Sequence, residues 1–143
     1  MSVEDRHVAL LKEAYRRWSE TKAGSVDHWV GLATDDVRLR SMTGGTTDGA
    51  PAMGFHGDFV GRDTLRDYFS QMANVWEMVS YEPLRFVAQG DQVAVLGTCE
   101  WKSKKTGKIA ESPFAQFFTF RDGHIAEIVE MFDTAAGIAA HAG

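Results

Sequence analysis

One carboxylate occupies a position where a charge is hard to place. Glu130 lies within the otherwise largely apolar run HIAEIVEMF. Side chains two residues apart share one face of a strand, so Glu130 shares its face with Ile128 and Phe132, which favour burial. Burying a carboxylate is costly unless the group is paired or protonated, and burial raises its pKa. An acid with a raised pKa suits proton transfer near neutral pH, which makes Glu130 the leading catalytic candidate.

A structural role for Glu130 is also compatible with the sequence. A basic side chain such as Arg38 or Arg40 could pair with it, because ion-pair networks perturb buried acids in the same way. A strand register shifted by one residue would instead turn Glu130 outward.

The remaining reactive residue types suggest less chemistry. Cys99 is expected to be a small core residue, since no partner histidine for a nucleophile is evident. His56 lies in a loop and could act as a pocket acid or base. No two histidines have ligand spacing on one element, so we expect no metal site. Exposed positions are expected for the other histidines, which are His7, His28, His124 and His141.

Length and charge narrow the class of protein. The 143 residues, 44% of them hydrophobic, suit a single domain spanning residues 1–143. The net charge of -5 argues against nucleic-acid binding, and the lysines around Thr106 and Gly107 fit a solvated turn. A single cysteine excludes an internal disulfide. Because there is no signal-like start and no apolar run of about 18 residues, we expect a cytoplasmic protein without a membrane partner.

Helical patterns dominate the first half of the chain. Val3 to Thr21 has apolar residues at spacings of three and four, and Ser2 with Asp5 resembles a capping box. A short helix, capped by Ser25 or Asp27, is expected to run to Ala33. A third helix is expected over Arg62 to Glu77. The apolar residues of these three helices include Leu11, Ala14, Tyr15, Trp18, Trp29, Leu65, Tyr68, Phe69, Met72, Val75 and Trp76.

Strand patterns dominate the second half. A first strand is expected at Val37 to Met42, and a long Gly- and Thr-rich loop, Thr43 to Gly57, follows it. Helices first and strands last predict an α+β fold, with the helices on one face of a bent sheet. Asp133 or Thr134 is expected to cap a final helix over Ala135 to Ala140. The other expected strands are a short one at Phe55–Val60 and an antiparallel meander of Val79–Ala88, Gln92–Lys102, Ile109–Phe120 and His124–Phe132.

Three stretches resemble one superfamily. They are YRRWSETKAGSVDHWVGLATDDVRLR, FHGDFVGRDTLRDYF and FTFRDGHIAEIVEMFDTAA, in that order. Their spacing resembles the SnoaL-like, ketosteroid-isomerase-related proteins of the nuclear transport factor 2-like superfamily. The resemblance implies a cystatin-like cone: three N-terminal helices packed on a curved, mostly antiparallel sheet, with a short C-terminal helix. It also implies an apolar pocket inside the cone and a homodimer formed through the outer face of the sheet.

The resemblance assigns the two faces of the sheet. It requires a three-residue loop, Arg121 to Gly123, with Gly123 as a left-handed bulge. A two-residue turn would put Gln116 and Glu130 on opposite faces, whereas this register makes them diagonal neighbours. The pocket face would hold Val93, Val95, Gly97, Cys99, Trp101, Gln116, Phe118, Phe120, Ile128, Glu130 and Phe132. The outer face would hold Ala115, Phe117, Val129 and Met131, whose apolar character fits a dimer.

The resemblance also identifies chemical positions. Ketosteroid isomerase uses an Asp base with a Tyr and a protonated Asp. The two acidic positions match Ser41 and Gln116 here, which argues against steroid isomerisation, while the tyrosine corresponds to Tyr15. The SnoaL-like cyclases are similar in placing a His and an acid/base Asp at the positions of Gln116 and Glu130. The catalytic candidates are therefore Glu130, Gln116 and Tyr15.

Two functions remain open at this point. One is a cofactor-free general acid/base isomerase, cyclase or hydrolase that acts on a carbonyl-bearing or cyclic hydrophobic small molecule. The other is a non-catalytic ligand-binding or dimerisation module, because one fold hosts both kinds of protein. The expected ligand-binding residues, beneath the loop of Thr43 to Gly57, are Trp18, Ser41, His56, Tyr68, Val95, Cys99, Trp101, Phe118 and Phe132.

Overall fold

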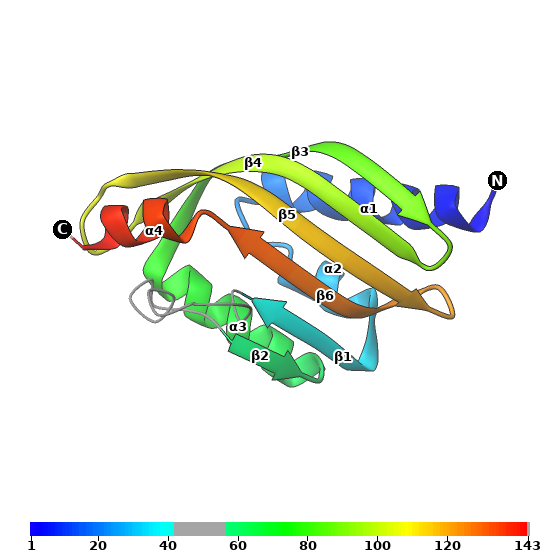
Figure 1. Ribbon diagram of the computed structural model, residues 1–143. Coiled ribbons are helices and arrows are strands. Elements are labelled where there is room, and N and C mark those ends of the chain that lie inside the picture. Colours follow the sequence, from blue (N-terminus) through cyan, green and yellow to red (C-terminus); the bar gives the residue numbers. More distant parts are fainter. Residues whose placement is uncertain (42–56, 143) are drawn as a thin grey trace.

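A mixed sheet and four helices account for most of the 1–41 and 57–142 ranges, which the computed structural model describes (Figure 1). The helices and strands follow the order that the sequence predicts, which confirms the α+β class. The elements are α1 (Val3–Glu20), α2 (Val26–Gly31), β1 (Ala33–Ser41), β2 (Gly57–Val60), α3 (Arg62–Val75), β3 (Trp76–Gln89), β4 (Gln92–Ser103), β5 (Ile109–Arg121), β6 (His124–Phe132) and α4 (Thr134–His141).

The strands form one sheet in the order β2-β1-β6-β5-β4-β3. Strands β3 to β6 make the predicted antiparallel meander, and β1 joins it parallel to β6. The long strands β3 to β5 curve over α1, α3 packs against β1 and β2, and α4 lies at the end of β5 (Figure 1). No helix in the described part of the chain is both long and apolar enough to span a membrane.

Helix α1 shows how the sequence specifies a two-sided element. Ser2 and Asp5 form the predicted capping box, with the Asp5 backbone N–H donating to the Ser2 hydroxyl at 3.0 Å. The predicted apolar stripe faces the sheet, and Leu11, Tyr15 and Trp18 are buried. Burying such side chains contributes about 1.5–3 kcal/mol each, which exceeds what capping adds.

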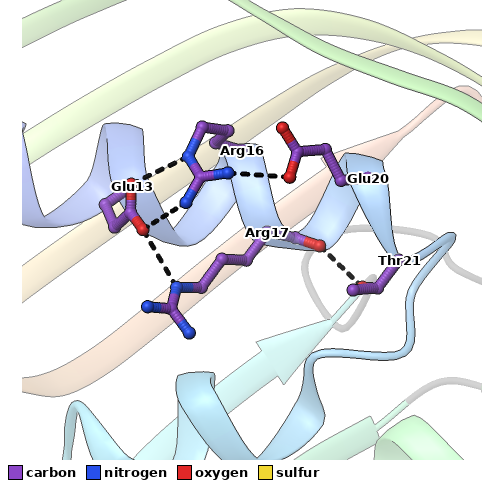
Figure 2. Close-up of polar contacts among 5 residues, drawn as sticks. All are labelled: Glu13, Arg16, Arg17, Glu20 and Thr21. Atoms are coloured by element: carbon purple, nitrogen blue, oxygen red, sulfur yellow. Dashed lines mark hydrogen bonds and ion pairs between the residues drawn. The ribbon is translucent and has the colours of Figure 1, made fainter.

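The solvent side of α1 is covered by ion pairs (Figure 2). Arg16 lies between Glu13 and Glu20, with its guanidinium 2.6 Å from one carboxylate and 2.7 Å from the other. Arg17 also reaches Glu13, at 3.0 Å, and its backbone carbonyl accepts a 2.6 Å hydrogen bond from Thr21. These arginines lower the pKa of Glu13 to about 2. Exposed pairs of this kind add little stability, so the apolar face holds the helix in place.

Three of the four histidines expected at the surface prove to be wholly or partly covered. His7 is only 3% exposed, because its ring stacks on Phe120 with centroids 4.0 Å apart. His141 is partly buried and its Nδ1 contacts the Ser103 hydroxyl at 2.8 Å, where α4 docks. His28 is partly buried, which lowers its pKa. Only His124 is fully exposed as expected.

The third helix ends two residues earlier than predicted. Trp76 begins strand β3 with an extended backbone, although the spacing of its apolar neighbours suggested that the helix continued to Glu77. Trp76 is buried in either case, so the apolar pattern alone could not separate the two structures. The cap of α4 is as predicted: the Asp133 carboxylate accepts from the Ala136 backbone N–H at 3.1 Å.

The turn between β5 and β6 differs from the expected one. Arg121 pairs with His124, so only Asp122 and Gly123 form the turn. Both have positive φ, +52° and +80°, as the type I′ turn of a two-residue hairpin requires. The three-residue loop of Arg121 to Gly123, with a Gly123 bulge, was therefore a wrong prediction.

A bulge inside β6 restores the expected face. The register between β5 and β6 shifts next to Thr119 and Phe120, where Ala126 has no partner on β5. An extra residue in one strand reverses the alternation beyond it. Gln116 and Glu130 consequently share the inner face and lie directly opposite each other, rather than diagonally.

Candidate functional site

Three polar residues form a row across the inner face of the sheet. Ser41 on β1 pairs with Glu130 on β6, and Glu130 pairs with Gln116 on β5. Val95 on β4 continues the row beyond Gln116. The burial pattern of β1 alternates through Val37, Leu39 and Ser41, and Ser41 is fully buried. The fold thus places two of the three catalytic candidates, Gln116 and Glu130, at paired positions of the sheet.

Glu130 is the buried acid of this row. It is 4% exposed, and burial raises its pKa to about 7, although hydrogen bonds from Tyr68 and Gln116 act in the opposite direction. Desolvation penalises the charged carboxylate, whereas donors stabilise it. The balance leaves a carboxyl group that gains and loses a proton near neutral pH.

Two chains of hydrogen bonds converge on Glu130. The Tyr15 hydroxyl donates to Gln116 Oε1, which leaves the Gln116 amide N–H₂ to donate to the carboxylate. On the other side, the Tyr68 hydroxyl bonds to Glu130, and Ser41 Oγ lies 3.3 Å from the Tyr68 oxygen. Helices α1 and α3 therefore each supply one tyrosine to the site from above the sheet.

Within the part of the chain that the structure describes, no ion pair explains the buried acid. Arg38 is exposed and its Nε donates instead to Asp58 on β2, at 2.9 Å. Arg40 is exposed as well. The alternative of a structural pair between Glu130 and one of these arginines is therefore contradicted.

Most of the predicted site residues surround one small cavity. Its volume is about 30 Å³, enough for one or two water molecules. The predicted residues that line it are Tyr15, Trp18, Tyr68, Trp101, Gln116, Phe118, Glu130 and Phe132. Three others do not reach it: Val95 and Cys99 are fully buried beside it, and Ser41 contacts it only through Tyr68. His56 and most of the expected covering loop, Thr43 to Gly57, lie outside the described residues.

The cavity has walls that the site prediction omitted. Tyr81 of β3 is the clearest case, since it is buried and stacks near Tyr15 with centroids 6.0 Å apart. A register shift between Met78 and Ser80 breaks the alternation of β3, so a period of two could not place Tyr81. The other residues omitted from the predicted site lie within the expected helices and strands; they are Trp29, Leu39, Phe69, Met72 and Ile128.

Nucleophile and metal chemistry find little support here. Burial raises the pKa of the Cys99 thiol to about 12, and a thiol that stays protonated is a poor nucleophile. Within residues 1–41 and 57–142, no group of three His, Cys, Asp or Glu side chains could hold a metal ion. The arrangement can instead move protons through Glu130.

Comparison with known proteins places the chain in a family. The sequence profile of the SnoaL-like domain matches residues 11–128. A comparison with curated protein sequences finds no match. A nuclear transport factor 2-like protein of unknown function from Burkholderia pseudomallei superposes with a TM-score of 0.81 at 20% identity, over 100% of each chain.

Two further solved structures share the fold. A putative polyketide cyclase from Xanthomonas campestris pv. campestris has a TM-score of 0.79 at 17% identity, over 98% of this chain and 99% of its own. A putative SnoaL-like polyketide cyclase from Jannaschia sp. CCS1 has a TM-score of 0.78 at 16% identity, over 100% and 96%. The chain therefore belongs to the SnoaL-like domain family, with the nuclear transport factor 2-like fold.

Proposed function

We propose that this protein is a cofactor-free general acid/base enzyme whose catalytic group is Glu130. The substrate class is a small hydrophobic molecule that is cyclic or carbonyl-bearing, and the reaction is an isomerisation or cyclisation. One observation carries the proposal: Glu130 is buried in an aromatic cavity with a pKa of about 7, and neutral hydrogen-bond donors hold it. Such an acid can take a proton from carbon or oxygen and return it elsewhere.

The neighbours of Glu130 have separate roles in this proposal. The ionised carboxylate removes the substrate proton, and the protonated acid then delivers it. Tyr68 and Gln116 stabilise the carboxylate before it takes the proton and after it has delivered it, because each donates a hydrogen bond to the charged form. Tyr15 is a positioning residue, since it fixes the Gln116 amide so that the N–H₂ group faces Glu130.

The size of the cavity favours a second candidate function. A space of about 30 Å³ admits no organic substrate unless side chains move. If the aromatic residues stay in place, they form an ordinary core, and the domain is a non-catalytic binding or dimerisation module.

Hydrogen exchange into cyclic ketones separates these candidates. We would incubate 2-tetralone and cyclohexanone with the protein in D₂O and follow loss of the α-proton NMR signals. The first candidate predicts exchange above the buffer rate for the parent protein and for Glu127→Gln, which removes a partly exposed acid of the same strand. Glu130→Gln should fold and lose the exchange, because the amide keeps the shape but not the titrating proton. Equal exchange in Glu130→Gln, or none in the parent, would contradict the proposal.

We also propose that the outer face of the sheet joins two copies of the chain. Leu96, Phe117 and Met131 are 49%, 38% and 62% exposed there. They surround a shallow groove of about 190 Å³ on β4, β5 and β6. Contiguous exposed apolar surface of this kind is typical of an interface.

A further inference from the structure

The acid of the candidate site has no basic partner among the described residues. None of the described residues that line the cavity is Lys, Arg or His, and the partners of Glu130 are the neutral side chains of Tyr68 and Gln116. The segment 42–56, outside the described residues, contains neither Lys nor Arg, and its one basic residue is His56. A buried carboxylate repels anions, and it attracts cations more strongly in a low-dielectric interior than in water.

Aromatic side chains line the same cavity as this acid. Trp29 stands nearly perpendicular to Tyr15 and to Trp18, at 82° and 87°, and Phe69 is tilted by 59° from Trp18. The same cavity also contains stacked pairs, since Trp29 lies at 7° to Phe118 and Tyr15 lies at 17° to Tyr81. The face of an aromatic ring carries negative potential, so an aromatic lining suits a ligand cation.

We propose that the site selects small hydrophobic ligands that carry a positively charged nitrogen, either a quaternary ammonium or a protonated amine. The aromatic walls would hold the alkyl groups around the nitrogen, and the carboxylate would supply the counter-charge. Ligands with a carboxylate or phosphate group would be excluded. This inference names the substrate class for the site of the proposed function, and so it rests on that site.

The other described groups whose pKa Glu130 influences do not change charge around neutral pH. Tyr15 on α1, Tyr68 on α3 and Tyr81 on β3 are buried, and burial raises the pKa of each well above its ordinary value. Burial raises the pKa of Cys99 on β4 to about 12. These four groups are the ones whose ionisation the charge of Glu130 opposes. Among the described residues, a change in cation binding between pH 6 and pH 8 would therefore report Glu130, and its loss in Glu130→Gln would distinguish Glu130 from His56.

A pair of probes with the same shape tests the proposal. Choline and 3,3-dimethyl-1-butanol differ only in the charged nitrogen, and 3,3-dimethylbutanoate is an anion of similar size. Binding would be measured by calorimetry and by tryptophan fluorescence. At pH 8 choline should bind about tenfold more tightly than the alcohol, the ratio expected for a desolvated cation on aromatic faces. The anion should not compete with choline.

The pH dependence gives a second measurement on the unaltered protein. With a pKa of about 7, the ionised fraction of Glu130 falls roughly tenfold between pH 8 and pH 6, and choline affinity should fall by the same factor. Bound choline should in turn lower the pKa of Glu130, which carboxyl carbon NMR can follow. Glu130→Gln should lose the preference for choline and its pH dependence, whereas Glu127→Gln should keep both.

Three results would overturn the inference: equal binding of the alcohol, competition by the anion, or no saturable binding of choline. These failures are distinguishable from failure of the proposed function. If Glu130→Gln abolishes ketone exchange but choline does not bind, only the inference about charge fails. If choline binds as described but Glu130→Gln leaves ketone exchange intact, the cation site stands and the catalytic role fails.

Discussion

Glu130 illustrates how a single side chain can be recognised before its environment is known. The period of two along β6 placed it between Ile128 and Phe132, and all three lie at the inner face. Its partners were harder to identify. Tyr68 looked like one more residue of an apolar helical stripe, and only the packing of α3 over β6 brings its hydroxyl to the carboxylate. The spacing of residues in the sequence shows which face of its own helix or strand a side chain occupies. It does not show which side chains of other elements that face will contact.

The buried state of Glu130 makes a prediction about stability. Its pKa is about 7 in the folded protein and near 4.5 in the unfolded chain, so the folded state holds the proton more tightly. The stability that Glu130 gains from its tighter proton binding in the folded state is fully present below pH 4.5 and is lost as the pH rises through 7. Relative to Glu130→Gln, the parent protein should lose about 2–3 kcal/mol of unfolding free energy between pH 5 and pH 8.

Urea unfolding of both proteins at several pH values checks this difference. Comparison with Glu130→Gln cancels the other titrating groups, and Glu127→Gln serves as the control because it removes a charge from the same strand. A gap between parent and Glu130→Gln that does not change with pH would show that Glu130 is not buried as described.

The tyrosine donors make a prediction about the pKa itself. Removing the Tyr68 hydroxyl takes a hydrogen bond from the carboxylate, so Tyr68→Phe should raise the titration midpoint of Glu130 by about one pH unit. Tyr81→Phe is the matched control, since Tyr81 is equally buried but is not among the hydrogen-bond donors to Glu130. Carboxyl carbon NMR measures the titration midpoint of Glu130 in both variants. An unchanged midpoint in Tyr68→Phe would remove Tyr68 from the site.

At the scale of elements, the alternation of apolar and polar residues predicted the strands well, but it predicted the turn and the bulge poorly. The meander of β3 to β6 follows from apolar runs separated by turn residues. The bulge at Ala126 could not be read from the sequence, because alanine fits either face of a strand. Two errors compensated each other as a result: the turn has one residue fewer than expected, and the bulge adds one. The expected face of Glu130 was correct although the expected turn was wrong.

Strand β4 offers a test of close packing between elements. Gly97 lies opposite Phe114, and a Cβ atom at Gly97 would approach the Phe114 ring and the Glu82 carbonyl oxygen to 2.3 Å. The oxygen belongs to the backbone and cannot easily give way. Gly97→Ala should therefore lower the unfolding free energy by about 1–3 kcal/mol.

Gly31→Ala is the control for this prediction. Gly31 lies in helix α2, and nothing within 4 Å would meet its Cβ atom. Alanine there should stabilise the protein by about 0.5–1 kcal/mol, because it restricts the unfolded chain and favours the helix. Thermal and urea unfolding measure both variants, and equal effects would show that the close contact at Gly97 does not exist.

For the whole molecule, the two faces of the sheet have different roles. The inner face meets the helices and carries the polar row, whereas on the outer face Leu96, Ala115 and Met131 pair across three strands. Phe117 and Val129 form a neighbouring pair on that face. The alternation of β5 and β6 predicted which residues point outward. It could not predict whether a partner covers them, because a partner surface leaves no trace in the spacing of one chain.

The final prediction is that the outer face forms a homodimer at micromolar concentration. Light scattering should give about twice the 15.8 kDa mass of the chain. Val129→Lys should shift the protein toward monomer, since a lysine in the apolar groove of Leu96, Phe117 and Met131 would lose its hydration when the copies meet. Val60→Lys is the control, because Val60 is 58% exposed but lies on β2, at the far edge of the sheet. A parent protein that scatters as a monomer would contradict the dimer. A dimer that Val60→Lys disrupts and Val129→Lys does not would place the interface at the β2 edge instead.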